Sequence, residues 1–515
     1  MSQRRGWSPP RSRGPRGFFG AGGGKWNRVP QPAMWGATSI QACGIYPFVV
    51  GTARPTSGAP LGRDLISGTA VCMDHASLFD AGVISSPSAF LLGLNGVGKS
   101  STAQTMMLGM MGRGMVPAVF NPLKKGEHTG LVSAAGGDVF EFGPTATHRL
   151  NLLSPGPMGR AAARIGGAVG AELAQQAEWR VVQQTQLALR VSRGARLEDF
   201  EDAMLEALVH SILTREKAPV TGDLLRAFES PSPDVLALAQ AADAAQLEHT
   251  YGRLGQSIRA MLSGDLGRLL GGTESVEIDP GNRGGFCFDT SQIDQNATKL
   301  LSTAMLMSWS LGMDSIDAHW QLYQADQREA AAAAEAGERY TPQVAWNGYT
   351  TLMDEFWYPM RSTPGIADRV DALARSNRSA GVAEMKITHS PKDMLALPDP
   401  KDREVARGLI EKTGLWGLMA LTAEDLRDLA QIKPLTEPEI SMVAGFNGAQ
   451  SWGASVSAQT ATTPPPGAGK VLFKVDGRPG IPVQMVRTQT QQQLHVTDER
   501  FRAKRREEAE RALTV

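Results

Sequence analysis

The stretch "LLGLNGVGKSST", residues 91–102, decides the fold of this 515-residue chain. Residues 93–100 fit the pattern G-x-x-x-x-G-K-[ST] at every fixed position, directly after the apolar run 89–92. Glycines let the main chain wrap a phosphate, so that N–H groups and the N-terminus of the next helix face the anion. The alternative is a glycine-rich turn with an accidental lysine, but the flanking strand and helix favour a nucleotide site.

Within this loop, Lys99 is predicted to reach the β- and γ-phosphates of ATP, and Ser100 is predicted to ligate Mg²⁺. The predicted nucleotide-binding residues are Gly93, Asn95, Gly96, Val97, Gly98, Lys99, Ser100 and Ser101.

An acidic pair at the end of another apolar run supplies the second half of the predicted site. Asp354 and Glu355 follow "GYTTLM" (348–353), and we expect this strand to neighbour the strand before the phosphate loop. Asp354 is predicted to hold the metal, and Glu355 to act as the general base for the attacking water. Adjacent acids are typical of RecA-like ATPase motors, whereas GTPase switches usually keep one. An exposed acidic strand end is the alternative.

Two arginines and a histidine surround the next apolar run, 382–387. Arg375 and Arg378 precede it, and either one is predicted to be an arginine finger for a neighbouring subunit or merely a surface cation. His389 ends the run beside Thr388, where a polar residue can sense the γ-phosphate. A metal-ligand role for His389 is not expected, because no second ligand has a usable spacing.

Alternating strands and helices predict an α/β fold with a mainly parallel sheet, interrupted by an all-helical insertion and preceded by a small β-rich lead-in. The predicted division is a disordered basic tail (1–32), the lead-in (33–87), an ATPase domain (88–155 and 284–490), the insertion (156–283) and a charged C-terminal helix (491–515). We expect the basic tail either to contact anionic lipid or DNA, or only to increase solubility.

Composition narrows the function classes. Charged residues are 20% of the chain and the formal net charge is zero, so no overall basic character drives nucleic-acid binding. Three scattered cysteines suit a reducing cytoplasm. No apolar stretch approaches the roughly 20 residues that span a bilayer. We therefore expect a cytoplasmic protein, peripheral at the inner face of the cell membrane.

Several stretches, taken in chain order, resemble one family: the cytoplasmic traffic ATPases of type IV secretion and conjugation systems, of the VirB-four/TraC kind, in the HerA/FtsK superfamily of RecA-like P-loop motors. The stretches are "TARPTSGAPLGRD" (52–64), "AVFNPLKKGEHTGL" (118–131), "GGDVFEFGPTATHRLNLLSP" (136–155), "SGDLGRLLGGTESVE" (263–277), "GGFCFDTSQI" (284–293), "LMDEFW" (352–357), "MKITHSP" (385–391) and "PLTEPEISMVAGFNG" (434–448). The phosphate loop and the acidic pair are the specific motifs among them.

The resemblance implies a RecA-like fold, ATP hydrolysis with Mg²⁺, and a hexameric ring in which an arginine of one chain completes the site of the next. It places Glu127 at a family acid among the catalytic residues. It also shows two departures, since Asn121 replaces an aspartate and His389 replaces a glutamine. About ninety residues precede Gly93, so we expect the motor half without the family's channel-docking N-terminal domain.

Three functions remain open at this point. The first is a motor that powers channel assembly or substrate translocation, with membrane-anchored channel subunits as partners. The second is a DNA-translocating coupling protein of the FtsK/TraG kind, which acts on DNA or a DNA–protein substrate. The third is a non-catalytic scaffold that responds to ATP, which the presence of both Asp354 and Glu355 disfavours.

Overall fold

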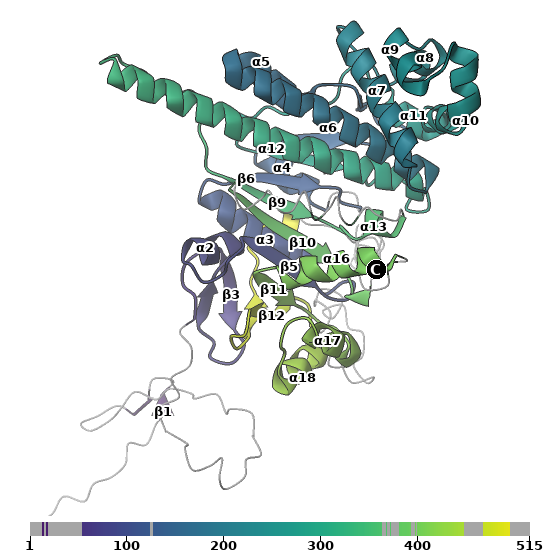
Figure 1. Cartoon of the computed structure of the whole chain (residues 1–515). Helices are drawn as coiled ribbons and strands as arrows, with labels where there is room; N and C mark the ends of the chain where they lie inside the picture. The colour runs from purple at the N-terminus through teal and green to yellow at the C-terminus, as the bar shows by residue number, and fades with distance from the viewer. Residues whose placement is uncertain are drawn as a thin grey trace, which may run out of the picture.

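The computed structural model describes residues 54–123, 127–362, 381–392, 399–446 and 467–494, together with residues 13–14, 17–18, 367, 371 and 397. Its centre is an 11-stranded sheet with the strand order β4-β3-β13-β12-β11-β5-β10-β9-β6-β8-β7 (Figure 1). A separate two-stranded ladder joins β1 (Arg13–Gly14) and β2 (Gly17–Phe18). The rest of the predicted tail lies outside the described residues.

The strands from β11 to β7 in that order run parallel. Their bounds are β5 (Ser88–Leu92), β6 (Val116–Phe120), β7 (Asp138–Glu141), β8 (Phe286–Asp289), β9 (Tyr349–Met353), β10 (Val382–Thr388) and β11 (Leu415–Leu418). Every residue of β5, β6, β9 and β10 is buried, as expected for parallel strands covered on both faces. The predicted α/β fold with a mainly parallel sheet is therefore confirmed.

An antiparallel edge extends this sheet beyond β11. It contains β3 (Pro60–Asp64), β4 (Ala70–Cys72), β12 (Lys470–Val475) and β13 (Ile481–Met485). The β-rich lead-in thus continues the main sheet, because β3 pairs with β13. Sequence analysis missed the hairpin β12–β13, although the mainly apolar run 471–475 followed by Asp476-Gly477 is a hairpin signal.

Short helices surround the sheet: α2 (His75–Asp80), α3 (Lys99–Gly112), α4 (Thr129–Ala134), α13 (Tyr358–Ser362), α16 (Pro400–Glu411), α17 (Ala423–Ala430), α18 (Glu437–Gly445) and α19 (Gln489–Leu494). The predicted C-terminal helix lies largely outside the described residues. Among the helices described, none combines the length and apolar character that crossing a bilayer requires.

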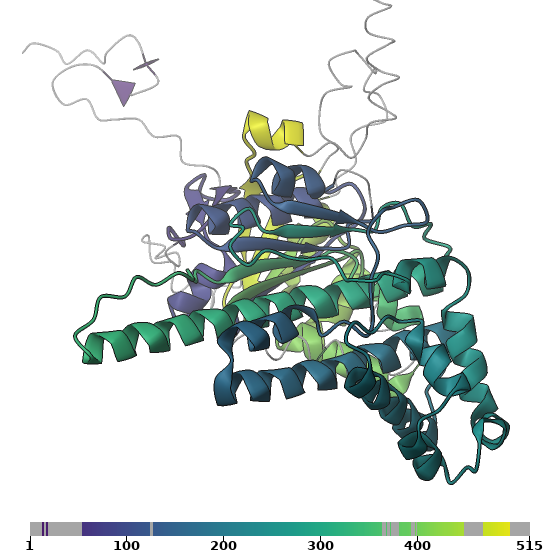
Figure 2. The ribbon, with the colours of Figure 1, turned by 90° about the horizontal axis from the view of Figure 1, so that it is seen from above.

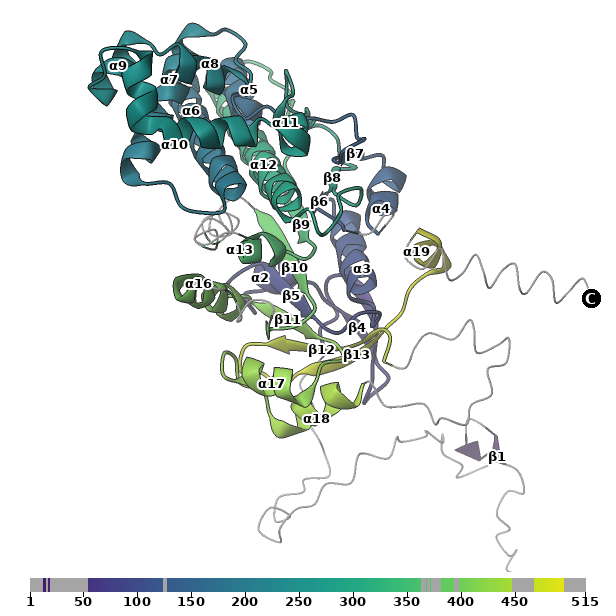
Figure 3. The same ribbon diagram turned by 90° about the vertical axis from the view of Figure 1, so that its right-hand side faces the viewer.

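A helical region, residues 156–270, separates β7 from β8 in the chain. It consists of α5 (Gly156–Ile165), α6 (Gly167–Arg193), α7 (Asp199–Arg215), α8 (Asp223–Glu229), α9 (Pro233–Ala239), α10 (Ala244–Met261) and α11 (Gly264–Leu270). Figures 1 and 3 show it at the end of the molecule opposite to α17 and α18. The predicted domain boundaries stay a proposal.

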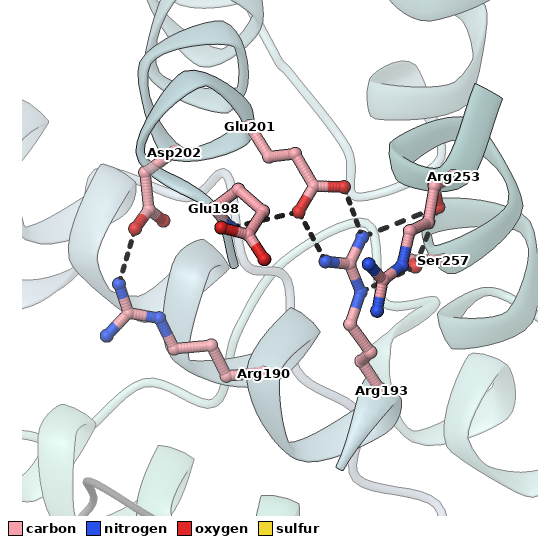
Figure 4. Close-up of polar contacts among 7 residues, drawn as sticks. All are labelled: Arg190, Arg193, Glu198, Glu201, Asp202, Arg253 and Ser257. Carbon is pink, nitrogen blue, oxygen red and sulfur yellow. Dashed lines mark hydrogen bonds and ion pairs between the residues drawn. The ribbon is translucent and has the colours of Figure 1, made fainter. Parts of the chain in front are cut away.

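Ion pairs join the helices of this region, and one of them, between Arg193 and Glu201, is buried (Figure 4). Arg193, at the end of α6, binds both carboxylate oxygens of Glu201 on α7, with 2.8 Å between Nη2 and Oε1. Its Nε also donates to Ser257 Oγ on α10, at 2.9 Å. Glu201 in turn accepts from Glu198 N in a capping box that starts α7. One guanidinium therefore holds three helices together.

The helix α12 (Thr298–Glu335) connects the helical region to the sheet. It is 38 residues long and contacts α5 and α6, alongside which it runs in Figure 2. Gly312 lets it approach β6 closely, because a Cβ atom there would lie 2.3 Å from the Phe120 ring.

Candidate nucleotide-binding site

The phosphate loop connects β5 to α3, as the sequence pattern indicates. Gly98 is the N-cap of α3 with φ 99°, and Gly96 has φ 79°. Both values lie in the left-handed region that side chains other than glycine rarely adopt. Gly93 meets a different constraint, because a Cβ atom there would lie 2.7 Å from Met419 Cβ. The glycines therefore allow a tight loop whose N–H groups start a helix.

Lys99 is buried and its ammonium group turns back over this loop. Its Nζ donates to the main-chain oxygens of Gly93 at 2.8 Å and Leu94 at 3.1 Å. It also contacts His389 Nδ1 at 2.7 Å, across 290 residues of sequence. Because an ammonium group has only donors, His389 Nδ1 must accept, and the remaining imidazole proton lies on Nε2.

The other ring nitrogen of His389 reaches the predicted general base. Its Nε2 contacts Glu355 Oε1, so we assign a hydrogen bond donated by the imidazole to the carboxylate. The second carboxylate oxygen of Glu355 accepts from Trp357 Nε1 at 2.6 Å. One imidazole ring therefore connects Lys99 with Glu355, and the three side chains form a continuous polar chain.

The strand order explains why the residue that follows β10 lies between Lys99 and Glu355. We expected the acidic pair on a strand next to β5, but β10 lies between β5 and β9. Neighbouring strands are about 4.8 Å apart, so Glu355 is two strand spacings from the phosphate loop. His389 follows the intervening strand β10 and fills that interval.

Oxygen ligands gather beside Ser100. Its Oγ donates to Glu127 Oε1 at 2.6 Å. Glu127, His128 and Asp354 are all buried, and one ligand atom from each lies within 4.8 Å of the others. His128 Nε2 is 3.6 Å from Asp354 Oδ2, and its Nδ1 is 3.3 Å from Gln104 Nε2. Hydroxyl and carboxylate oxygens are the donors that Mg²⁺ prefers, so Ser100, Glu127 and Asp354 fit this ion.

Two strand ends at this site adopt left-handed backbone conformations. Glu355 has φ 48° after β9, and Asn121 has φ 57° after the adjacent strand β6. Such a conformation costs a non-glycine residue about 1–2 kcal/mol. Strain of this kind concentrates at functional sites, where the surrounding structure holds it in place.

The remaining predicted residues fall into three groups. Val97 is buried within the loop, whereas Asn95 and Gly96 are exposed on its outer side. Ser101 accepts a hydrogen bond from Arg487, whose Nη1 lies 3.0 Å from its Oγ. Arg375 and Arg378 lie outside the described residues. Sequence analysis missed His128 and Arg487, since neither belongs to a spaced motif and both reach the site only through the fold.

Comparisons with known proteins bear on the fold. No model of a protein family and no curated protein matches the sequence. The solved structure of VirB4 of Thermoanaerobacter pseudethanolicus does match, with 18% identity and a TM-score of 0.58, over 86% of this chain and all 100% of that chain.

Structures of a bacterial conjugative coupling protein also match, more weakly. TrwBdeltaN70 is 12% identical with a TM-score of 0.46, over 86% of this chain and 93% of that one. TrwB in complex with ADP and Mg²⁺ is 13% identical with a TM-score of 0.45, over 87% and 93%. These two scores are too low to bear on the fold. The likeness to VirB4 shows that this chain shares the fold of that protein, as the resemblance implied.

Proposed function

We propose that this protein is an ATP-hydrolysing motor of a type IV secretion or conjugative transfer system, which powers channel assembly or substrate translocation. The observation that carries the proposal is the chain from Lys99 through His389 to Glu355, which joins the phosphate loop to a carboxylate placed to activate water. The fold of VirB4 and the ordered sequence resemblance support the type IV assignment.

In this proposal, N–H groups of residues 93–101 bind the phosphates of ATP and Lys99 binds its β- and γ-phosphates. Ser100 and Asp354, with Glu127 beside them, would hold Mg²⁺, which supplies positive charge against the phosphate oxygens. Glu355 accepts the proton of the attacking water. Lys99 must exchange its present acceptors for phosphate oxygens, and His389 would carry that change to Glu355.

The partners and the location belong to the same proposal. A hexameric ring would place an arginine of one subunit at the site of the next, and Arg375 and Arg378 are the candidates. Membrane-anchored channel subunits would bind this protein at the inner face of the cell membrane, from the cytoplasm. Measuring the mass of the purified protein with ATP and Mg²⁺ tests the ring, since a monomer would leave an arginine finger without a neighbour.

Phosphate release by the purified chain, measured with and without DNA, tests the activity. We expect steady release that DNA leaves unchanged and that Glu355→Gln lowers by about 10²-fold or more, since Gln cannot accept the proton. Glu424→Gln is the matched control, because Glu424 is 75% exposed and pairs only with Lys392 in the described contacts. Stimulation by DNA would favour the coupling protein instead. Bound ATP without turnover would favour the scaffold.

A further inference from the structure

The hairpin β12–β13 forms a wall of the phosphate loop, on the side opposite to His389. Gly469 N, just before β12, donates to Val97 O at 2.9 Å, and Gly469 also accepts from Met485 N at 2.7 Å. The same nitrogen would lie 3.5 Å from a Cβ atom on Gly98. In the sheet, β11 lies between this hairpin and β5. The hairpin therefore contacts the phosphate loop from the far side of β11.

Arg487 follows β13 and extends this wall to the first turn of α3. Its backbone position is fixed, because Val486 N donates to Leu61 O at 2.9 Å and β13 pairs with both β12 and β3. Its guanidinium donates from Nη1 to Ser101 Oγ at 3.0 Å. Arg487 and Ser101 are both half-buried, so this contact lies at the rim of the loop.

The two cations of the site contact different parts of the loop. Lys99 contacts His389, which follows β10, and His389 contacts Glu355, the residue that in the proposed function activates water at the γ-phosphate. Arg487 comes from β13 and meets Ser101, two residues further into α3 than Lys99. Main-chain groups of such a loop cradle the α- and β-phosphates, so Arg487 lies at the end occupied by these two groups.

We propose that Arg487 is a nucleotide-binding residue which the same chain supplies to the α- or β-phosphate. A guanidinium carries N–H donors in a planar fork that matches phosphate oxygens. The contact would be made to ADP and ATP alike, which separates Arg487 from Lys99 and from an arginine finger that acts on the γ-phosphate. This inference rests on the proposed nucleotide-binding function.

Calorimetric titration of the full chain with ADP and Mg²⁺, and with a non-hydrolysable ATP analogue, tests the inference. In Arg487→Gln we expect Kd to rise about tenfold for both ligands, the loss of one charge-assisted hydrogen bond. Arg487→Lys, which keeps the charge, should lie between this variant and the wild type. Arg478→Gln is the matched control, since Arg478 is an exposed arginine at the other end of the same hairpin.

The possible outcomes separate the two proposals. Unchanged ADP affinity in Arg487→Gln would overturn the inference while leaving the motor intact. So would a lower kcat with unchanged Kd, because that pattern belongs to a residue acting on the transition state. A wild-type chain that binds no ADP would instead contradict the proposed function itself. Should Arg487→Gln fail to fold, Arg487→Met decides, since it removes the charge and keeps an unbranched side chain, and ADP affinity equal to the wild type would reject a phosphate contact.

Discussion

Lys99 and Arg193 are both buried cations, but the molecule satisfies them in different ways. Arg193 faces the Glu201 carboxylate within the helical region, and the two groups neutralise each other. Lys99 instead donates to two carbonyl oxygens and to the neutral ring of His389. Both cations make charge-assisted hydrogen bonds, but only Arg193 has an acceptor that also neutralises its charge. A lysine whose described hydrogen-bond acceptors are uncharged can exchange those acceptors for an anion, whereas an arginine paired with a carboxylate cannot readily do so.

Removing Arg193, the cation that is paired with a carboxylate, should have the largest effect on the free energy of unfolding. Arg193→Met would leave Glu201 buried without its partner, and breaking a buried pair in this way costs about 3–5 kcal/mol of unfolding free energy. Urea unfolding followed by circular dichroism measures the loss. Phosphate release at a temperature where the variant is folded should stay close to the wild type, because the described contacts of Arg193 all lie within the helical region.

Two controls sharpen this prediction. The double variant Arg193→Met/Glu201→Leu should regain much of the loss, since no buried charge remains. The hydrogen bond from Arg193 lowers the pKa of Glu201 below its ordinary value of 4.5, so the pair stabilises the fold above that pH and less as acid protonates the carboxylate. The difference between wild type and Arg193→Met should therefore shrink below about pH 4. A difference that is constant with pH would mean that packing, and not charge, connects α6 to α7.

Removing Lys99 should lower the rate of phosphate release and leave folding intact. In Lys99→Met, phosphate release is expected to fall about 10²–10³-fold, as when one donor to a developing anion is lost. Unfolding free energy should change by less than about 1 kcal/mol, because the described acceptors of Lys99 carry no charge and the cost of burying its own charge is relieved. A folding loss as large as that of Arg193→Met would show that Lys99 is a structural cation and that the contrast does not hold.

The sequence predicts the parts of this site that are local in the chain, and it does not predict the contacts between distant segments. The phosphate loop and the strands β5, β9 and β10 are local patterns of a few residues, so the apolar runs and the turn residues beside them predict these elements. Contacts between distant segments leave no such pattern. Ser101 meets Arg487 across 386 residues, and His128 joins Asp354 only once β6 and β9 pair. The position of β10 between the loop and the acids likewise depends on the strand order.

A third buried basic group, His75, should make the stability of the fold depend on pH. Burial lowers its pKa to about 4, and the neighbouring Asp74 carboxylate only partly opposes the shift. The unfolded chain therefore binds a proton near pH 6.5 that the folded chain refuses until about pH 4. Between these values the folded state should lose about 3 kcal/mol of unfolding free energy. In His75→Gln this contribution should vanish, which urea unfolding at pH 7 and pH 4.5 measures by difference from the wild type.

The smallest effect is expected at His389, and it tests whether the chain from Lys99 to Glu355 matters at all. An amide can accept from Lys99 with its oxygen and donate to Glu355 with its nitrogen, so His389→Gln should keep kcat within about threefold of the wild type. His389→Leu removes both bonds at similar size and should lower kcat about tenfold, with a smaller change in KM, which corresponds to about 1.4 kcal/mol of lost transition-state stabilisation. Single-turnover phosphate release separates the two variants. Equal rates in wild type and His389→Leu would mean that Lys99 and Glu355 act independently, and the neutral acceptors around Lys99 would then be a matter of packing alone.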